Sequence, residues 1–330
     1  MSEAAPGGAF TRSAPEMTLR LGTRRSPMAM NQSGQVADLL TQRTGCRVEL
    51  VGISTFGDVS RAELAQIGGT GVFVSALREA LLGGEVDLAV HSLKDLPTGP
   101  AAGIVLAAVP PRDDPRDALV ARDGAKLADL PTGARVGTGS PRRAAQLLAL
   151  RGDLRCVPIR GNAGTRMAKI GAGELDGVLL AYAGLARIEH LDAVTQVFEP
   201  EEMLPAPGQG ALAVECRAAD AGLIQLLAAI SDDPSMAAIS AERSLLETLA
   251  AGCSAPVAGY AAQRAGDNSL DMRAAVMSAD GSTVLRAQGR GPASAARQLG
   301  RDLAAELLRS GAAELITVQR APASSGNDAQ

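Results

Sequence analysis

Short apolar runs alternate with helical patterns along most of this chain. The apolar runs predict buried strands, and periodicity near 3.6 predicts helices at 28–40 and 74–82. The predicted strands of the first part are 18–22, 47–53, 86–90 and 104–109. The same alternation continues from 117 to 204, with strands predicted at 154–159 and 176–181 and a helix after Ser140. Strands that alternate with helices predict the α/β class.

Two segments with the composition of turns separate these units. They are 110–115, which reads PPRDDP, and 205–210, which reads PAPGQG. The residues that follow, 211–215, have a strand pattern, and we expect this strand to return to the first unit. The sequence therefore predicts two α/β lobes that are joined by a double crossover.

The C-terminal part has a different pattern. A predicted helix at 236–250 precedes three strands at 257–262, 270–277 and 283–288 and a helix at 293–309, which is the order of a small α+β domain. We expect disordered tails at 1–17 and 319–330, where small and polar residues show no periodicity. The predicted domains are 18–110 with 211–229 for domain 1, 116–204 for domain 2 and 233–318 for domain 3.

Composition and charge exclude several classes of function. The 330 residues carry a net charge of −4 and only 2% aromatic residues, so neither a stacking platform for nucleic acid nor a basic surface for membranes is expected. No apolar run is long enough for a membrane span, and the first 17 residues lack a signal-peptide core. The cysteines, Cys46, Cys156, Cys216 and Cys253, have neither metal-site spacing nor a disulfide pattern. These features predict a cytoplasmic protein without a metal, and we expect a monomer because no long apolar surface helix stands out.

Arginines gather where predicted strands turn into helices. Ser140 is a natural N-cap, and Arg142 and Arg143 follow it in the first helical turn. The positive end of a helix dipole does not favour cations, so an anion shared by helix amides and guanidinium groups is one explanation. Ordinary surface arginines, in a chain where arginine is common, are the alternative. Similar junctions occur at 23–27 and 160–166.

Two further positions are candidates for chemistry. His91, Lys94 and Asp95 directly follow the buried strand at 86–90, where open α/β sheets place functional groups. The alternatives are a hydrogen-bonded structural imidazole for His91 and a turn residue for Asp95. Cys253 lies in a glycine-flanked loop, where a thiol can be exposed and reactive, although an ordinary loop cysteine has the same pattern.

Six motifs, in this order, resemble the porphobilinogen deaminase family over residues 19–311. They are TRRSPMAMNQ at 23–32, VHSLKDLPT at 90–98, GTGSPRR at 137–143, RGNAGTR at 160–166, PAPGQGALAVECR at 205–217 and AGCSAP at 251–256. The resemblance implies two lobes like those of periplasmic binding proteins (type II) and a third domain that carries Cys253. It also implies a covalent dipyrromethane cofactor, one per chain, joined to Cys253 by a thioether. Four porphobilinogen molecules would be condensed with loss of ammonia and released by hydrolysis as hydroxymethylbilane.

The resemblance also assigns roles to single residues. Asp95 matches the catalytic carboxylate, which would stabilise the cation that remains when ammonia leaves. The carboxylates of the pyrroles need bidentate and hydroxyl donors. The residues implied to bind the cofactor are Lys94, Thr138, Ser140, Arg142, Arg143, Arg160, Gly161 and Thr165. Those implied to bind the substrate are Arg24, Arg25, Ser26, Gln32, Arg166 and Arg187.

Some positions depart from the family pattern, and a different function competes with the enzyme. Thr70 and Ser75 stand where lysine is usual, and the other departures are Asn31, Phe56 and Pro141. We interpret 56–73 as a mobile lid that limited proteolysis would cut. The competing interpretation is a non-catalytic two-lobed protein that binds a polycarboxylate. It explains the arginines and the crossovers, but neither the cysteine loop nor the third domain.

Overall fold

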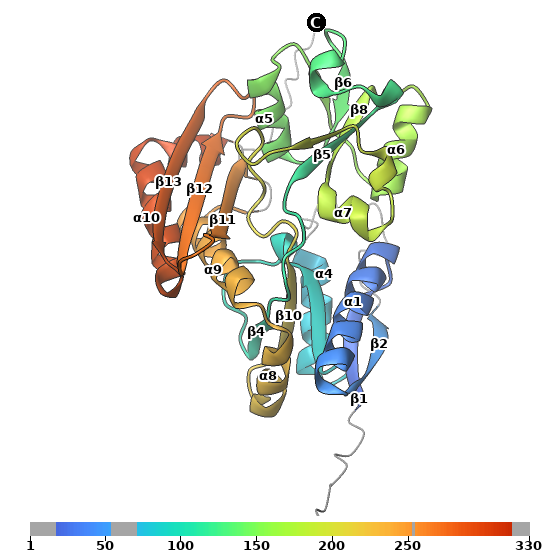
Figure 1. The fold of residues 1–330 in the computed structure, drawn as a ribbon, viewed down its shortest axis with the longest axis vertical. Helices are drawn as coiled ribbons and strands as arrows, with labels where there is room; N and C mark the ends of the chain where they lie inside the picture. The colour runs from blue at the N-terminus through green and yellow to red at the C-terminus, as the bar shows by residue number, and fades with distance from the viewer. Residues whose placement is uncertain (1–17, 54–70, 253–254, 319–330) are drawn as a thin grey trace, which may run out of the picture.

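The computed structural model describes residues 18–53, 71–252 and 255–318, and its elements form three groups around three separate sheets (Figure 1). Two groups are stacked along the long axis of the molecule, and the third lies beside both (Figure 1). No helix among the described residues is long and apolar enough to cross a membrane. The predicted tails, Cys253 and most of the predicted lid lie outside the described residues.

The first lobe is a five-stranded sheet in the order β2-β1-β3-β10-β4. Its strands are β1 (Thr18–Arg24), β2 (Arg47–Ile53), β3 (Leu88–Ser92), β4 (Ile104–Ala108) and β10 (Leu212–Arg217). Its helices are α1 (Pro27–Thr44), α4 (Gly71–Leu82), α8 (Ala221–Leu227) and the 3-10 turns η1 (Leu93–Asp95) and η5 (Ala228–Ile230). β10 is antiparallel to β3 and β4, whereas β1 is parallel to β2 and β3. The strand after the second crossover therefore returns to the first lobe, as predicted.

The second lobe repeats this arrangement in the order β7-β6-β8-β5-β9. Its strands are β5 (Asp117–Ala121), β6 (Arg135–Gly137), β7 (Arg155–Val157), β8 (Gly177–Ala181) and β9 (Gln196–Phe198). Its helices are α5 (Pro141–Leu150), α6 (Ala163–Gly171), α7 (Tyr182–Arg187) and the 3-10 turns η2 (Arg122–Gly124), η3 (Leu127–Asp129) and η4 (Leu191–Ala193). β5 takes the place that β10 has in the first lobe and is antiparallel to β8 and β9. This confirms two α/β lobes of the periplasmic-binding-protein type II class with a double crossover.

The third group is a three-stranded antiparallel sheet in the order β11-β12-β13. Its elements are α9 (Asp233–Thr248), β11 (Val257–Gln263), β12 (Ser269–Met277), β13 (Val284–Pro292), η6 (Ala293–Ala295), α10 (Ala296–Arg309) and α11 (Ala312–Val318). Apolar residues of α9, α10 and the sheet form its core, among them Leu245, Met272 and Leu303. The result is the predicted α+β unit.

Some local predictions differ from the structure. The run at 154–159 was predicted as a buried strand, but β7 covers only Arg155–Val157, lies at the sheet edge and is partly exposed. Pro158 explains the early end, because it has no backbone N–H for a ladder. The last long helix begins at Ala296, since η6 precedes it. The short elements α7, α8 and β9 contain too few residues to show a period.

The third group is fixed to the two crossovers by one buried carboxylate. Glu242 of α9 forms an ion pair with Arg112 of the first crossover (Nη1 to Oε1, 2.6 Å). It also accepts the backbone N–H of Gly208 in the second crossover at 2.6 Å and that of Ala261 in β11 at 2.8 Å. The Arg112 Nε donates to the carbonyl oxygen of Gln209 at 2.8 Å. The Glu242 cluster, formed by these residues, therefore holds both crossovers and the third sheet together.

Candidate active site

Two adjoining cavities lie where the parts of the molecule meet. The smaller, of about 310 Å³, is lined from the first lobe by α1 and β3 and from the second lobe by α7. The larger, of about 870 Å³, is lined by both lobes, the second crossover and the third domain. Met28, Lys94 and Asp95 line both cavities, so the cavities adjoin at the end of β3.

The smaller cavity collects four of the predicted substrate-binding residues. Ser26 caps α1 by accepting the N–H of Ala29 at 3.3 Å, as its position before Pro27 predicts. Arg187, at the end of α7, is buried and donates to the Asp113 carboxylate and to the Gly210 carbonyl, both at 2.9 Å. The predicted substrate-binding residues that line this cavity are Arg24, Ser26, Gln32 and Arg187.

The loop that carries Lys94 and Asp95 is held by the second crossover. The N–H of Leu93 donates to the Ala211 carbonyl at 3.0 Å. Gly208 has a φ of +78°, and a Cβ added there would lie 2.5 Å from Leu93 Cδ2 and 3.0 Å from Lys94 N. Glycine is therefore required for this close approach. Burial lowers the pKa of Lys94 to about 8, and the positive charge of Arg143 adds to this effect.

The larger cavity is lined by the arginines of two helix starts. Ser140 caps α5, with its hydroxyl accepting the N–H of Arg143 at 3.4 Å. Arg142 and Arg143, in the first turn of α5, are only 3% and 6% exposed but still line the cavity. Arg166 of α6 also lines it and donates from Nε to the Gly161 carbonyl at 2.8 Å. Burial, with a contribution from Arg143, lowers the pKa of Arg166.

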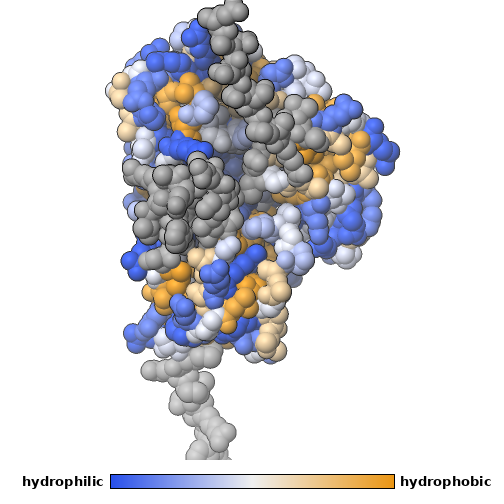
Figure 2. Space-filling model, turned by 180° about the vertical axis from the view of Figure 1, so that it is seen from behind, coloured by the Kyte–Doolittle hydropathy of each residue, from blue (hydrophilic) through white to orange (hydrophobic). Residues whose placement is uncertain are grey.

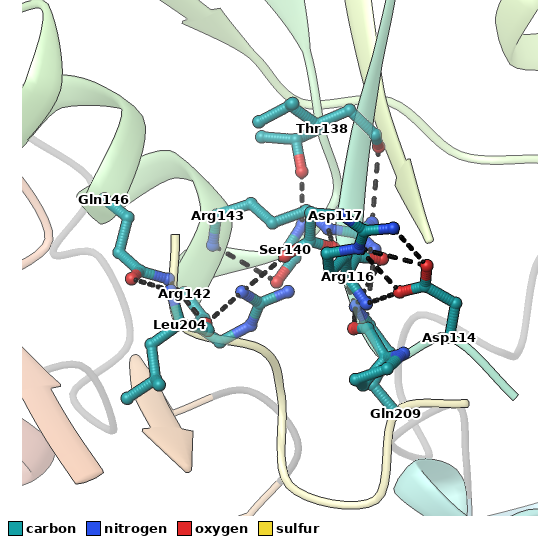
Figure 3. A network of polar contacts seen from close by, with 12 residues as sticks. Asp114, Arg116, Asp117, Thr138, Ser140, Arg142, Arg143, Gln146, Leu204 and Gln209 are labelled. Atoms are coloured by element: carbon teal, nitrogen blue, oxygen red, sulfur yellow. Dashed lines mark hydrogen bonds and ion pairs between the residues drawn. The ribbon is translucent and has the colours of Figure 1, made fainter. Parts of the chain in front are cut away.

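Both buried arginines share one carboxylate, that of Asp117, and all three residues are drawn in Figure 3. Asp117, the first residue of β5, forms ion pairs with Arg142 Nη1 at 2.7 Å and Arg143 Nη2 at 2.7 Å. Its Oδ1 also accepts the Arg143 Nε at 2.8 Å and the Gln209 Nε2 at 2.9 Å. Burial alone would raise the pKa of Asp117, but the two arginines and the hydrogen bonds outweigh it and hold the pKa well below its usual range.

The structure does not bring every predicted site residue to these cavities. Among the described residues, four candidates line neither cavity: Arg25, Thr138, Arg160 and Thr165. Arg25 is exposed and donates to the Gly52 carbonyl, and Arg160 is exposed at the end of its loop. The Thr138 Oγ1 accepts the N–H of Ser140, and the Thr165 Oγ1 donates to Asn162.

The remaining predicted residues are placed as follows. Lys94, Ser140, Arg142, Arg143, Gly161 and Arg166 line the larger cavity. Arg166, to which the resemblance assigns a role in substrate binding, thus lines the same cavity as most of the predicted cofactor-binding residues. Cys253 is outside the described residues, but Gly252 and Ala255 on either side of it line the same cavity.

Sequence reasoning missed three residues of this region. The sequence pattern indicates Met28 only as an apolar position of a helix, yet Met28 lines both cavities. The pattern indicates Asp117 only as the start of the second α/β unit and Gln209 only as part of a segment with the composition of a turn. An aspartate at the start of an apolar strand is a usable signal, because a carboxylate buried there needs a cationic partner.

Comparison with known proteins gives a consistent result. Residues 19–225 match the model described as porphobilinogen deaminase, dipyromethane cofactor binding domain, and residues 236–309 match that of the porphobilinogen deaminase C-terminal domain. The porphobilinogen deaminase of Thermobifida fusca is 61% identical over 305 residues, covering 90% of this chain and 95% of that protein. Porphobilinogen deaminase 1 of Streptomyces coelicolor is 56% identical, covering 91% and 98%. Among solved structures, the methionine-binding protein MetQ has a TM-score of 0.43 and 13% identity, covering 66% and 92%.

Proposed function

This chain belongs to the porphobilinogen deaminase family, and from that premise we propose which of its residues carry out the reaction. The activity is the stepwise condensation of four porphobilinogen molecules with loss of ammonia, followed by hydrolytic release of hydroxymethylbilane. The fold places two adjoining cavities on either side of Lys94 and Asp95. We assign the incoming porphobilinogen to the smaller cavity and the dipyrromethane cofactor to the larger.

The donors of the larger cavity fit a ligand with several carboxylates. Arg142, Arg143 and Arg166 line it, and the Nε of Arg142 is buried with no hydrogen-bond partner among the described residues. Gly252 and Ala255, on either side of Cys253 in the sequence, line the same cavity. We assign the thioether to Cys253. We further assign the cofactor carboxylates to these arginines together with Lys94 and Ser140. When bound, the dipyrromethane supplies the pyrrole position to which the first porphobilinogen is joined.

Asp95 is the proposed catalytic residue, and its position on both cavities is the observation that carries this assignment. A carboxylate at this junction can accept the N–H of a pyrrole on either side. It can thus stabilise the positive charge that develops as ammonia leaves, and it can hold a proton during the transfer. Arg24, Ser26, Gln32 and Arg187 bind the carboxylates of porphobilinogen from the smaller cavity, which orients its reacting carbon toward Asp95.

The test combines mass measurement with one substitution. Intact mass and peptide mapping of the purified protein should show two porphobilinogen-derived rings on the peptide that contains Cys253. Asp95→Ala should lower ammonia release from porphobilinogen by about a hundredfold or more while the cofactor mass is kept. Asp192→Ala removes an exposed carboxylate that lines neither cavity and serves as the control. Full turnover in Asp95→Ala, or rings attached to another residue, would contradict the assignment.

We also propose that the chain acts as a cytoplasmic monomer. The free thiols of Cys46, Cys156 and Cys216 support a reducing compartment. On the face shown in Figure 2, the hydrophobic residues that are not covered form several groups separated by hydrophilic ones. Such a surface supports a monomer, because stable dimers bury one continuous apolar area. Light scattering should give the mass of one chain, and a mass of two chains would contradict the proposal.

A further inference from the structure

Asp117 is a buried carboxylate that touches the site only through other residues. It is fully buried and lines neither cavity. Its partners are Arg142, Arg143 and Gln209, all of which line the larger cavity. These four residues form what we name the Asp117 cluster, most of whose contacts can be followed in Figure 3. Asp117 can therefore act on a ligand only through the side chains it holds or through the field of its charge.

The charges of the Asp117 cluster do not balance. Two guanidinium groups face one carboxylate, and the buried Nε of Arg142 has no partner among the described residues. Burial of such an excess charge costs free energy unless a further anion completes the cluster. The cluster is open to the larger cavity, since its arginines line it. A carboxylate of a ligand in that cavity is the group that would restore the balance.

The cluster is also tied to both crossovers. Asp117 lies two residues after the first crossover, and the Gln209 Nε2 donates to the Pro115 carbonyl at 2.7 Å. Gln209 itself belongs to the second crossover, and its Oε1 accepts the Arg143 Nη2 at 3.3 Å. The Arg142 Nη1 donates to the Leu204 carbonyl, just before the second crossover, at 2.7 Å. The two guanidinium groups are thus fixed to the segments that join the lobes.

We propose that Asp117 is a positioning residue that holds Arg142 and Arg143 as a fixed pair, leaving one unit of positive charge for a carboxylate of the cofactor. This inference rests on the proposed function, because the ligand it assigns is the dipyrromethane.

The competing role for Asp117 is to neutralise charge. The two roles predict opposite results. Loss of a merely neutralising carboxylate makes the cavity more positive and strengthens anion binding, whereas loss of a positioning carboxylate lets the guanidinium groups separate and weakens it.

Asp117→Asn is the decisive substitution, because the amide has the shape of the carboxylate but turns one acceptor into a donor. Its NH2 group would face donors of Arg142, Arg143 or Gln209, so the pair could no longer keep its arrangement. We expect the fraction of folded protein that carries the cofactor, measured by intact mass, to fall by about fivefold or more. In the molecules that carry it, KM for porphobilinogen should change by less than about threefold, because the substrate is assigned to the smaller cavity, which no residue of the Asp117 cluster lines.

Glu242→Gln is the matched control. It also removes a buried carboxylate from an arginine at a crossover, but Arg112 and Glu242 line neither cavity. Urea unfolding should show that both variants are destabilised, and only Asp117→Asn should lose cofactor from its folded fraction. If Asp117→Asn does not fold, Gln209→Met releases Arg143 and Asp117 without changing the charge and should lower occupancy by about threefold.

Each outcome decides the inference. Equal cofactor occupancy in Asp117→Asn and Glu242→Gln at equal loss of stability would overturn it, as would occupancy in Asp117→Asn at or above that of the unsubstituted protein. If the unsubstituted protein shows neither the added mass of the cofactor nor ammonia release, the proposed function is contradicted instead, and with it the ligand assigned here. Lower occupancy in Asp117→Asn alone supports the positioning role.

Discussion

The Glu242 cluster and the Asp117 cluster are built from the same parts but differ in their charge balance. Each has a fully buried carboxylate, and each involves both crossovers. Glu242 meets one arginine and two backbone N–H groups, so the charges cancel and the oxygens are fully used. Asp117 meets two arginines, and one guanidinium nitrogen stays without a partner among the described residues.

The difference separates an interaction that joins domains from one that prepares a binding site. A balanced buried ion pair has no electrostatic need for a ligand, and Arg112 and Glu242, the ion pair of the Glu242 cluster, accordingly line neither cavity. The unbalanced cluster opens onto the larger cavity, where it can bind an anion. Gln209 belongs to both clusters. Its backbone carbonyl accepts a hydrogen bond from Arg112, while its side chain forms hydrogen bonds with Asp117 and Arg143. A displacement of the second crossover would therefore change hydrogen bonds in both clusters.

The largest effect is expected for Arg112→Met. It leaves Glu242 buried without its cation, so the free energy of unfolding should fall by about 3–5 kcal/mol in urea titrations. Arg286→Met, at an exposed position of β13, is the control and should change it by less than about 0.5 kcal/mol. A loss for Arg112→Met as small as that of the control would show that the balanced pair contributes little.

Arg142→Met should have a smaller effect on stability and a different effect on binding. It leaves one arginine for Asp117, which restores the balance, so we expect the free energy of unfolding to change by no more than about 1 kcal/mol. The free energies of unfolding of Arg142→Met and of the unsubstituted protein are compared in cofactor-free protein, which is made without a supply of porphobilinogen. The fraction of this protein that acquires the cofactor on incubation with porphobilinogen should nevertheless fall by about tenfold or more, because a charged donor is lost. A destabilisation as large as that of Arg112→Met would contradict the charge argument.

The smallest effect concerns the pH dependence that Lys94 gives to the larger cavity. Burial and Arg143 lower the pKa of Lys94 to about 8, so its ammonium group is present below that pH and is lost as the pH rises through it. A bound carboxylate favours the charged form, so cofactor-free protein should take up cofactor from porphobilinogen about threefold more slowly above pH 8 than below it. In Lys94→Gln the rate of cofactor uptake should no longer decrease above pH 8. An unchanged pH profile in Lys94→Gln would assign the dependence to another group.

Much of the fold and part of the site could be predicted from local sequence. The apolar runs and the two proline-rich crossovers identify two α/β lobes, and Ser26 and Ser140 identify the starts of α1 and α5. These features depend on residues close in sequence, which is why a pattern shows them. The helix start at Ser140 indicates Arg142 and Arg143 as candidates for an anion site, whereas the strand end before Asp95 fits a turn residue equally well, and only the resemblance assigns Asp95 a catalytic role.

Only the tertiary structure decided which of these arginines share a cavity and what holds them. β5 and β6 both pair with β8, which places Asp117 beside the start of α5, the helix that follows β6, although Asp117 and Arg142 are 25 positions apart in sequence. The exposure of Arg25 and Arg160 could not be predicted either, since arginine is equally compatible with a surface and with a site. Sequence by itself determined the elements and the residue types that can bind carboxylates. The charge balance of each buried cluster depends on contacts between distant segments, and those exist only in the folded chain.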